Sequence, residues 1–190
     1  MLTIALNILD IAQNSIRAKA SEISVVITES KLQDLFEVII RDNGEGIPSE
    51  IKDRVTDPFV TTRTTRKTGM GLPLLKFQSG LAGGDLTVDS CEGKGTRVRA
   101  TFALSHIDRQ PLGDIAGVMT ILMTANPGID FLYGHKTDTG EYNFSSKEIR
   151  DYLGINDFND SRLLADIREM INQNLNDIDA SYVKQNINLT

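Results

Sequence analysis

Apolar residues follow two different spacings near the start of the chain, and each spacing predicts one type of secondary structure. Five apolar residues recur at helical spacing: Ile4, Ile8, Ile11, Ala12 and Ile16. We therefore predict a first helix that starts almost at the N-terminus and runs to about Ala18. From Ile23 to Thr28, apolar residues alternate with smaller or polar ones, which is typical of a strand.

The spacing of apolar residues also predicts helices and strands from residue 35 to residue 104. Residues 35–41 are rich in β-branched and aromatic side chains and predict a second strand, paired with the first as an antiparallel hairpin. After it we expect a helical turn near Ser49, an aperiodic loop over 55–70, a helix over 72–81 and strands over 86–90 and 97–104. This order predicts an α+β fold with a mostly antiparallel sheet covered by helices. It differs from the regular strand–helix alternation of a doubly wound nucleotide-binding fold.

A boundary is expected near residues 105–113. We therefore predict one domain over residues 1–104 and a C-terminal α/β extension over residues 105–190. The patterns of the extension predict a helix over 114–125, a hairpin over 129–145 that turns at 136–140, and helices over 146–153 and 160–175. No resemblance or motif assigns a role to the extension.

Composition and charge restrict the classes of function. The chain has 190 residues, 40% of them hydrophobic, so a buried core is expected. The net charge of -6 disfavours broad attraction to nucleic acid or to an anionic membrane, although residues 63–67 form a local basic segment. The apolar runs are too short to span a membrane, and the single cysteine, Cys91, excludes an intrachain disulfide. We expect a cytoplasmic protein that binds neither nucleic acid nor membranes.

The first predicted helix carries polar residues that are candidates for metal binding and catalysis. Asp10 and Asn14 are four residues apart, so their side chains share one helix face. An amide oxygen is a suitable ligand for Mg²⁺, and a carboxylate one turn away can orient an attacking water. Arg17 continues this stripe and is a candidate contact for a phosphate. The alternative is an ordinary amphipathic helix with a solvated polar face.

A second candidate for a ligand-binding residue follows the predicted strand over 35–41. Asp42 precedes a turn that contains Gly44 and Gly46. A carboxylate at this place can accept a hydrogen bond from the exocyclic amino group of adenine. The two glycines allow a ligand to approach the backbone closely. The alternative is a tight turn without a ligand, because Asp-Asn-Gly is a common turn sequence.

Two glycine motifs are further candidates for a ligand-binding site. Residues 69–72 (Gly-Met-Gly-Leu) stand at the start of a predicted helix, where free N–H groups and the helix dipole favour an anion. Residues 93–96 (Gly-Lys-Gly-Thr) lie between two predicted strands, and a plain hairpin turn is their alternative explanation. Lys94 in that turn is expected to be a solvated charge.

Four motifs follow one another along the chain: residues 10–14, 42–47, 69–72 and 93–96. In this order they resemble the N, G1, G2 and G3 boxes of the GHKL ATPase superfamily. They are most similar to the catalytic ATP-binding domain of histidine kinases. Residues 57–62 resemble the F box of that domain, with Phe59 at its centre, and residues 67–76 resemble its lid-closing segment and following helix. The resemblance covers residues 4–104 and implies a Bergerat-type α/β sandwich.

The resemblance also implies ligands and residue roles. It implies Mg²⁺ and ATP as cofactors, with Asn14 binding the metal beside the ATP phosphates and Asp42 binding adenine. Thr96 would help to hold that carboxylate and a buried water, and Asp10 is the candidate catalytic residue. The other residues assigned to the ATP site are Arg17, Gly44, Gly46, Ile47, Phe59, Lys67, Thr68, Gly69, Met70, Gly71 and Leu72.

Three features depart from the family pattern. Asp10 stands where many members have glutamate, and its shorter side chain weakens the argument for a general base. The sequence begins directly on the N-box helix, without the dimerisation and phosphoacceptor domain of a histidine kinase. His106 and His135 both lie after residue 104, in no phosphoacceptor-like helix, and His135 is expected at the surface beside the hairpin turn. A self-contained sensor kinase is therefore not expected.

Two functions remain open from the sequence. The first is Mg-ATP-dependent phosphoryl transfer to a separate partner protein in signal transduction, or slow ATP hydrolysis. The second is a non-catalytic regulatory module in which ATP orders the loop over 55–70 and so builds or hides a surface for a protein partner. A third possibility, a fold whose motifs bind nothing, is opposed by the complete set of motif residues.

Overall fold

The computed structural model of the chain describes residues 3–52, 54–57 and 71–181. Its strands are β1 (Glu22–Ser30), β2 (Leu35–Asp42), β3 (Leu86–Cys91), β4 (Gly95–Ala103), β5 (Asp130–Lys136) and β6 (Glu141–Ser145). Its helices are α1 (Ile4–Arg17), α2 (Ser49–Lys52), α3 (Gly71–Leu81), α4 (Ile115–Ala125), α5 (Ser146–Leu153) and α6 (Ser161–Asp177). These elements confirm the predicted α+β class, and their ends lie close to the predicted ones.

Short polar side chains explain where several helices begin. The Thr3 hydroxyl accepts a hydrogen bond from the Leu6 N–H at the start of α1, and Asp114 accepts one from the Gly117 N–H at the start of α4. Ser145 and Asp160 cap α5 and α6 in the same way. Each cap satisfies a backbone donor that the helix itself leaves unpaired.

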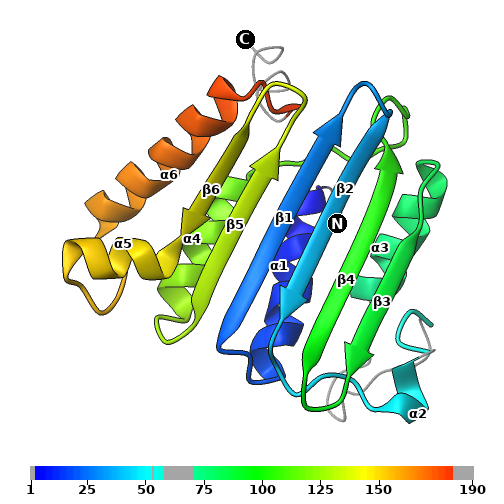
Figure 1. The fold of residues 1–190 in the computed structure, drawn as a ribbon, viewed down its shortest axis with the longest axis horizontal. Coiled ribbons are helices and arrows are strands. Elements are labelled where there is room, and N and C mark those ends of the chain that lie inside the picture. Colours follow the sequence, from blue (N-terminus) through cyan, green and yellow to red (C-terminus); the bar gives the residue numbers. More distant parts are fainter. Residues whose placement is uncertain (1–2, 53, 58–70, 182–190) are drawn as a thin grey trace.

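One six-stranded sheet runs across the molecule in the order β3-β4-β2-β1-β5-β6 (Figure 1). Neighbouring strands are antiparallel, except that β1 and β5 are parallel. The first strand of the N-terminal part thus lies next to the first strand of the C-terminal part. Because β5 and β6 continue this sheet, residues 105–190 do not form a separate sheet in the described structure.

The two faces of the sheet differ. Helices α1, α3 and α4 lie side by side behind the strands, and α6 packs against α4 (Figure 1). Along β1 and β2 buried residues alternate with more exposed ones, as expected when one face is covered and the other is not. No helix of the described residues covers the front of β1, β2 and β4 in Figure 1. We call this side the open face.

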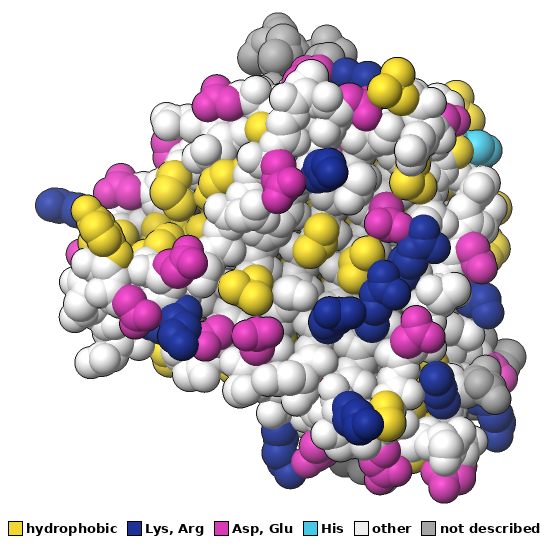
Figure 2. Space-filling model, viewed as in Figure 1, with side chains coloured by type: hydrophobic (Ala, Val, Ile, Leu, Met, Phe, Trp, Pro, Cys, Tyr) yellow, Lys and Arg dark blue, Asp and Glu magenta, His cyan; other side chains and the backbone are white. Residues whose placement is uncertain are grey.

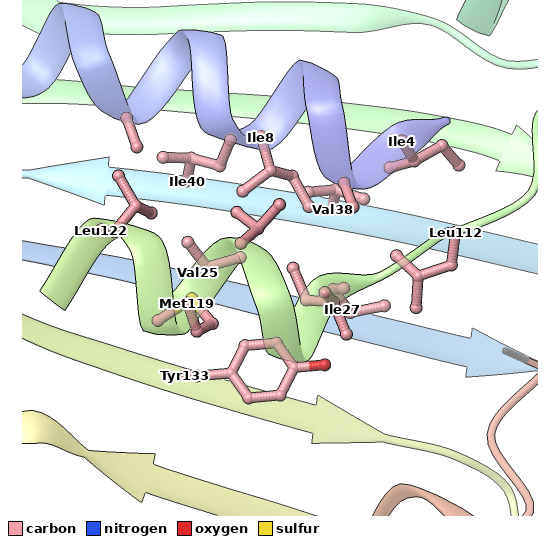
Figure 3. Packing of buried hydrophobic residues seen from close by; sticks show 14 of the residues in the cluster. Ile4, Ile8, Val25, Ile27, Val38, Ile40, Leu112, Met119, Leu122 and Tyr133 are labelled. Atoms are coloured by element: carbon pink, nitrogen blue, oxygen red, sulfur yellow. The ribbon is translucent and has the colours of Figure 1, made fainter. Parts of the chain in front are cut away.

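Both halves of the chain share one hydrophobic core (Figure 3). Side chains of α1 and α4 meet the covered face of the sheet; those labelled in the figure are Ile4, Ile8, Val25, Ile27, Val38, Ile40, Leu112, Met119, Leu122 and Tyr133. Full burial of one such side chain stabilises a fold by about 1.5–3 kcal/mol. The proposed division into domains at residue 104 remains a prediction, and any such division cuts through this core.

The prediction that His135 lies at the surface is wrong. Only 1% of His135 is exposed, and its ring contacts two other buried groups, the Tyr133 hydroxyl (2.7 Å from Nδ1) and the Glu29 carboxylate (2.9 Å from Nε2). The sequence suggested exposure because His135 stands next to the hairpin turn. It is buried because β5 lies between β1 and β6, and the segment after α6 folds back, with the Ser181 N–H donating to Glu29.

Candidate nucleotide site

A cavity lies between α1, the adjoining ends of β2 and β4, and the start of α3. Its volume is about 80 Å³, well above the ~10–15 Å³ that one water needs. The predicted site residues that line it are Asn14, Asp42, Gly46, Ile47, Leu72 and Thr96. Ile11, Ile40 and Val98 give the cavity an apolar wall. The structure thus brings residues from all four motifs to one place.

Asp42 is the central polar group of this cavity. It is the last residue of β2 and is only 9% exposed. Its Oδ2 atom accepts a hydrogen bond from the Ser15 hydroxyl at 2.6 Å, and its Oδ1 atom accepts from the backbone N–H groups of Gly44 (2.9 Å) and Thr96 (3.3 Å). These donors come from α1, the turn after β2, and β4, so three elements fix the orientation of one carboxylate.

Ser15 is a site residue that the sequence analysis missed. It lines the cavity, is 4% exposed, and makes the shortest of the three hydrogen bonds to Asp42. One signal was available, because Ser15 follows Asn14 and stands four residues after Ile11, on the buried stripe of the first helix. A small polar residue on such a stripe needs a hydrogen-bond partner.

Ser90 is a second missed residue, and it joins two of the motifs. Its hydroxyl accepts a hydrogen bond from the Ile47 N–H at 2.8 Å and lies 3.0 Å from the Gly95 carbonyl oxygen. It also lies 2.9 Å from the Thr96 hydroxyl. The turn after β2 and the turn between β3 and β4 are therefore held together by one side chain. Lys94, in the second turn, is exposed as predicted.

Glycines are required where the turn after β2 passes between other backbone segments. A Cβ atom on Gly44 would lie 2.6 Å from the Ala18 carbonyl oxygen at the end of α1. Gly46 has a φ of 73°, and a Cβ atom there would overlap the carbonyl of Cys91. Any larger residue would push the turn away from α1 or β3. In this structure both glycines serve close packing of the backbone beside the cavity.

The polar stripe of α1 faces the start of α3. Asp10 is half-buried, and its carboxylate occupies the place that a side chain on Gly71 would need. Asn14 is half-buried as well, and its amide oxygen accepts a hydrogen bond from Arg17 Nη1 at 3.0 Å. The described residues include no cluster of three or more His, Cys, Asp or Glu side chains that could hold a metal ion.

Part of the predicted site lies outside the described residues. It consists of Phe59, Lys67, Thr68, Gly69 and Met70. Most of the predicted loop over 55–70 lies there too. The assignment of these five residues to the ATP site stays a prediction.

Comparison with known proteins identifies the first half of the chain. The family described as "Histidine kinase-, DNA gyrase B-, and HSP90-like ATPase" matches residues 3–106, more than half of the sequence. The chain belongs to this family. Residues 3–106 are an ATP-binding, histidine kinase-like ATPase domain, as the four motifs suggested.

Individual relatives match over the same part. The sensor histidine kinase WalK of Bacillus subtilis (strain 168) is 34% identical over 97 residues, which cover 48% of this chain and 16% of WalK. Sporulation kinase D of the same organism is 32% identical over 98 residues, which cover 52% of this chain and 19% of that kinase. The chain therefore spans less than a fifth of the length of these relatives.

A solved structure described as the N-terminal domain of a DNA repair protein shares the fold more widely. It is 18% identical, with a TM-score of 0.54, over 77% of this chain and 53% of that one. This is a larger share of the chain than residues 3–106, so the shared fold includes part of the C-terminal half. Among the described residues, no helix has both the length and the apolar character needed to cross a bilayer.

Proposed function

We propose that the cavity beside Asp42 binds the adenine ring of Mg-ATP. The observation that carries this proposal is the buried Asp42 carboxylate, held by three donors at the edge of a cavity with apolar walls. A carboxylate can accept a hydrogen bond from the amino group of adenine, whereas guanine presents its O6 oxygen at the corresponding position. The site should therefore prefer ATP to GTP.

We assign the phosphates and the metal to the neighbouring polar residues. The Asn14 amide oxygen is a hard ligand suited to Mg²⁺, which usually keeps several waters and shares phosphate oxygens. Arg17 now donates to that oxygen, and its guanidinium can instead contact a phosphate. Gly71 is the first residue of α3 and lies beside Asp10, and the N-terminus of a helix favours an anion.

The reaction that we favour is transfer of the γ-phosphoryl group to a separate partner protein, or slow hydrolysis. Such chemistry needs mainly positioning and charge neutralisation, and two relatives are kinases by name. When bound, Mg²⁺ would neutralise charge on the phosphates. Asp10 is the candidate for orienting the attacking group, since it lies one turn before Asn14 on α1.

A second candidate function rests on the position of Asp10. Its short side chain is packed against Gly71, which supports a role in positioning α3 more than a role as a base. In that case ATP would act as a switch for a protein-binding surface and would not be consumed.

Incubation with γ-labelled ATP separates these functions. The protein is incubated alone and with a cell extract, and the label is followed. Label on another protein would support phosphoryl transfer, and release of free phosphate by the purified protein would support hydrolysis. Binding of ATP with neither product would support the switch. Failure to bind ATP by calorimetry would remove the proposed adenine site itself.

A further inference from the structure

The open face of the sheet carries a hollow next to the cavity that contains Asp42, and Asp42 and Thr96 are among the lining residues of both. Successive residues of a strand point to opposite faces. Asp42 and Thr96 face the cavity, and their neighbours Arg41 and Arg97 therefore project from the open face. The hollow has a volume of about 450 Å³, and its basic lining residues are Arg41, Lys52, Lys94 and Arg97. We call this the cationic groove.

Four separate segments supply these positive charges. Arg41 comes from β2, Lys52 from α2, Lys94 from the turn between β3 and β4, and Arg97 from β4. Figure 2, which views the open face, shows a row of dark-blue Lys and Arg side chains across it. These basic residues lie on a chain whose net charge is -6.

Two acidic residues, Asp42 and Asp89, stand among the lining residues of the groove, against four basic ones. The Asp42 carboxylate is held by its three hydrogen-bond donors. The Asp89 Oδ2 atom is 4.0 Å from Arg97 Nη1, at the limit of an ion pair. Among the described residues, Arg41, Lys52 and Lys94 form no ion pair. Other basic residues on the surface do, for example Lys19 with Glu45 at 2.6 Å.

The strand register brings two of the positive charges together. Arg41 and Arg97 are direct partners across β2 and β4, so both side chains leave the same face of neighbouring strands. Like charges at directly opposite positions destabilise a sheet. An anionic ligand placed between the two guanidinium groups would remove this repulsion and accept hydrogen bonds from both.

We propose that the cationic groove binds an acidic segment of a partner protein, a short stretch rich in Asp and Glu. Several separate carboxylates match positive charges that come from four segments, and each guanidinium can bind a carboxylate through two hydrogen bonds. A long polyanion such as nucleic acid would extend beyond the groove. The net negative charge of the rest of the protein would repel it there. A short segment senses mainly the local charge, because exposed charges are screened beyond about 8–10 Å in physiological salt.

Fluorescence anisotropy with a labelled acidic peptide tests this proposal. The probe is a short peptide of alternating Glu and Asp with glycine ends, titrated with the purified full chain without nucleotide, so the result does not depend on ATP binding. The test variant is Arg41→Gln with Arg97→Gln. The matched control is Lys136→Gln with Lys147→Gln, which removes the same charge from exposed residues of β5 and α5.

We expect the Arg41→Gln, Arg97→Gln variant to bind the peptide at least about tenfold more weakly than wild type, and the control to change affinity less than about twofold. Equal weakening in both variants would mean diffuse attraction and would overturn the proposal, as would the absence of peptide binding to wild type. Tighter binding of a single-stranded oligonucleotide of equal charge would assign the groove to nucleic acid. If the arginine variant does not fold, judged by circular dichroism, Lys52→Gln with Lys94→Gln replaces it under the same criteria.

Discussion

At the scale of single residues, Asp42 offers the most direct test of the proposed site. Asp42→Asn preserves the shape of the side chain, and the Ser15 hydroxyl can turn to accept from the new amide. The charged acceptor for adenine becomes a neutral one, so ATP binding should weaken by about 1–3 kcal/mol. Calorimetry measures this loss, and Asp89→Asn on the open face is the control. Equal affinity for ATP in wild type and Asp42→Asn would exclude Asp42 from the adenine role.

Asn14 tests the metal assignment separately. Asn14→Ala removes the amide oxygen that we assign to Mg²⁺, so ATP binding should weaken chiefly when magnesium is present. The measurement is ATP affinity of wild type and variant, each in magnesium and in EDTA. If Asn14→Ala loses the same factor in both conditions, the residue supports the structure of α1, through its contact with Arg17, and does not hold the metal.

At the scale of elements, a buried polar network joins β1, β5 and the segment after α6. Burial raises the pKa of Tyr133 well above its ordinary value of 10.0, so the hydroxyl keeps its proton and can donate to Nδ1 of His135. The other ring nitrogen, Nε2, then donates to Glu29. Burial alone would raise the pKa of Glu29, but hydrogen bonds from His135 and Ser181 outweigh it and hold the pKa below 4.5.

This network predicts a pH dependence of stability. A carboxyl group whose pKa is lower in the folded state contributes stability above its unfolded-state pKa, and this stability is lost as the pH falls through the folded-state value. Glu29→Gln should therefore destabilise the protein by about 1–3 kcal/mol at neutral pH, and the difference from wild type should shrink below pH 4.5. Urea unfolding at about pH 6 and about pH 3 measures it.

The control for this experiment is Glu92→Gln, in the exposed turn between β3 and β4. Its free energy of unfolding should follow that of wild type at both pH values. A constant difference between Glu29→Gln and wild type across the pH range would show that the charge of Glu29 is not what stabilises the network.

The Glu29 network also shows what the sequence could not predict. Periodicity located the helices and strands, because it depends only on neighbours in the chain. The motifs and the family resemblance pointed to Asn14, Asp42 and Thr96, which line one cavity in the structure. The pairing of β1 with β5, across about a hundred residues, leaves no local pattern, so the burial of His135 was missed. The helix pattern signalled the burial of Ser15 but not its partner Asp42, and Ser90 was missed because its partner Ile47 is also distant in sequence.

At the scale of the whole molecule, the sheet separates two surfaces with different chemistry. The nucleotide cavity lies on the face covered by helices, and the cationic groove lies on the open face. The same two strands, β2 and β4, contribute to both, with alternate residues on each side. A partner bound at the groove would therefore contact the strands that hold Asp42 and Thr96, which line both the groove and the cavity.

The shared core leads to a prediction about the whole chain. A fragment ending at residue 104 would lose α4 and β5, so β1 would become an edge strand and Ile8 and Ile27 would lose part of their cover. We expect this fragment to unfold at a clearly lower temperature than the full chain, or to aggregate.

In the full chain, Met119→Ala should cost about 2–5 kcal/mol and preserve a single unfolding transition, measured by calorimetry and circular dichroism. Ile121→Ala, at an exposed position on the same helix, should cost little. A fragment as stable as the full chain, or separate transitions in Met119→Ala, would mean that residues 1–104 fold independently and that the core is not shared energetically.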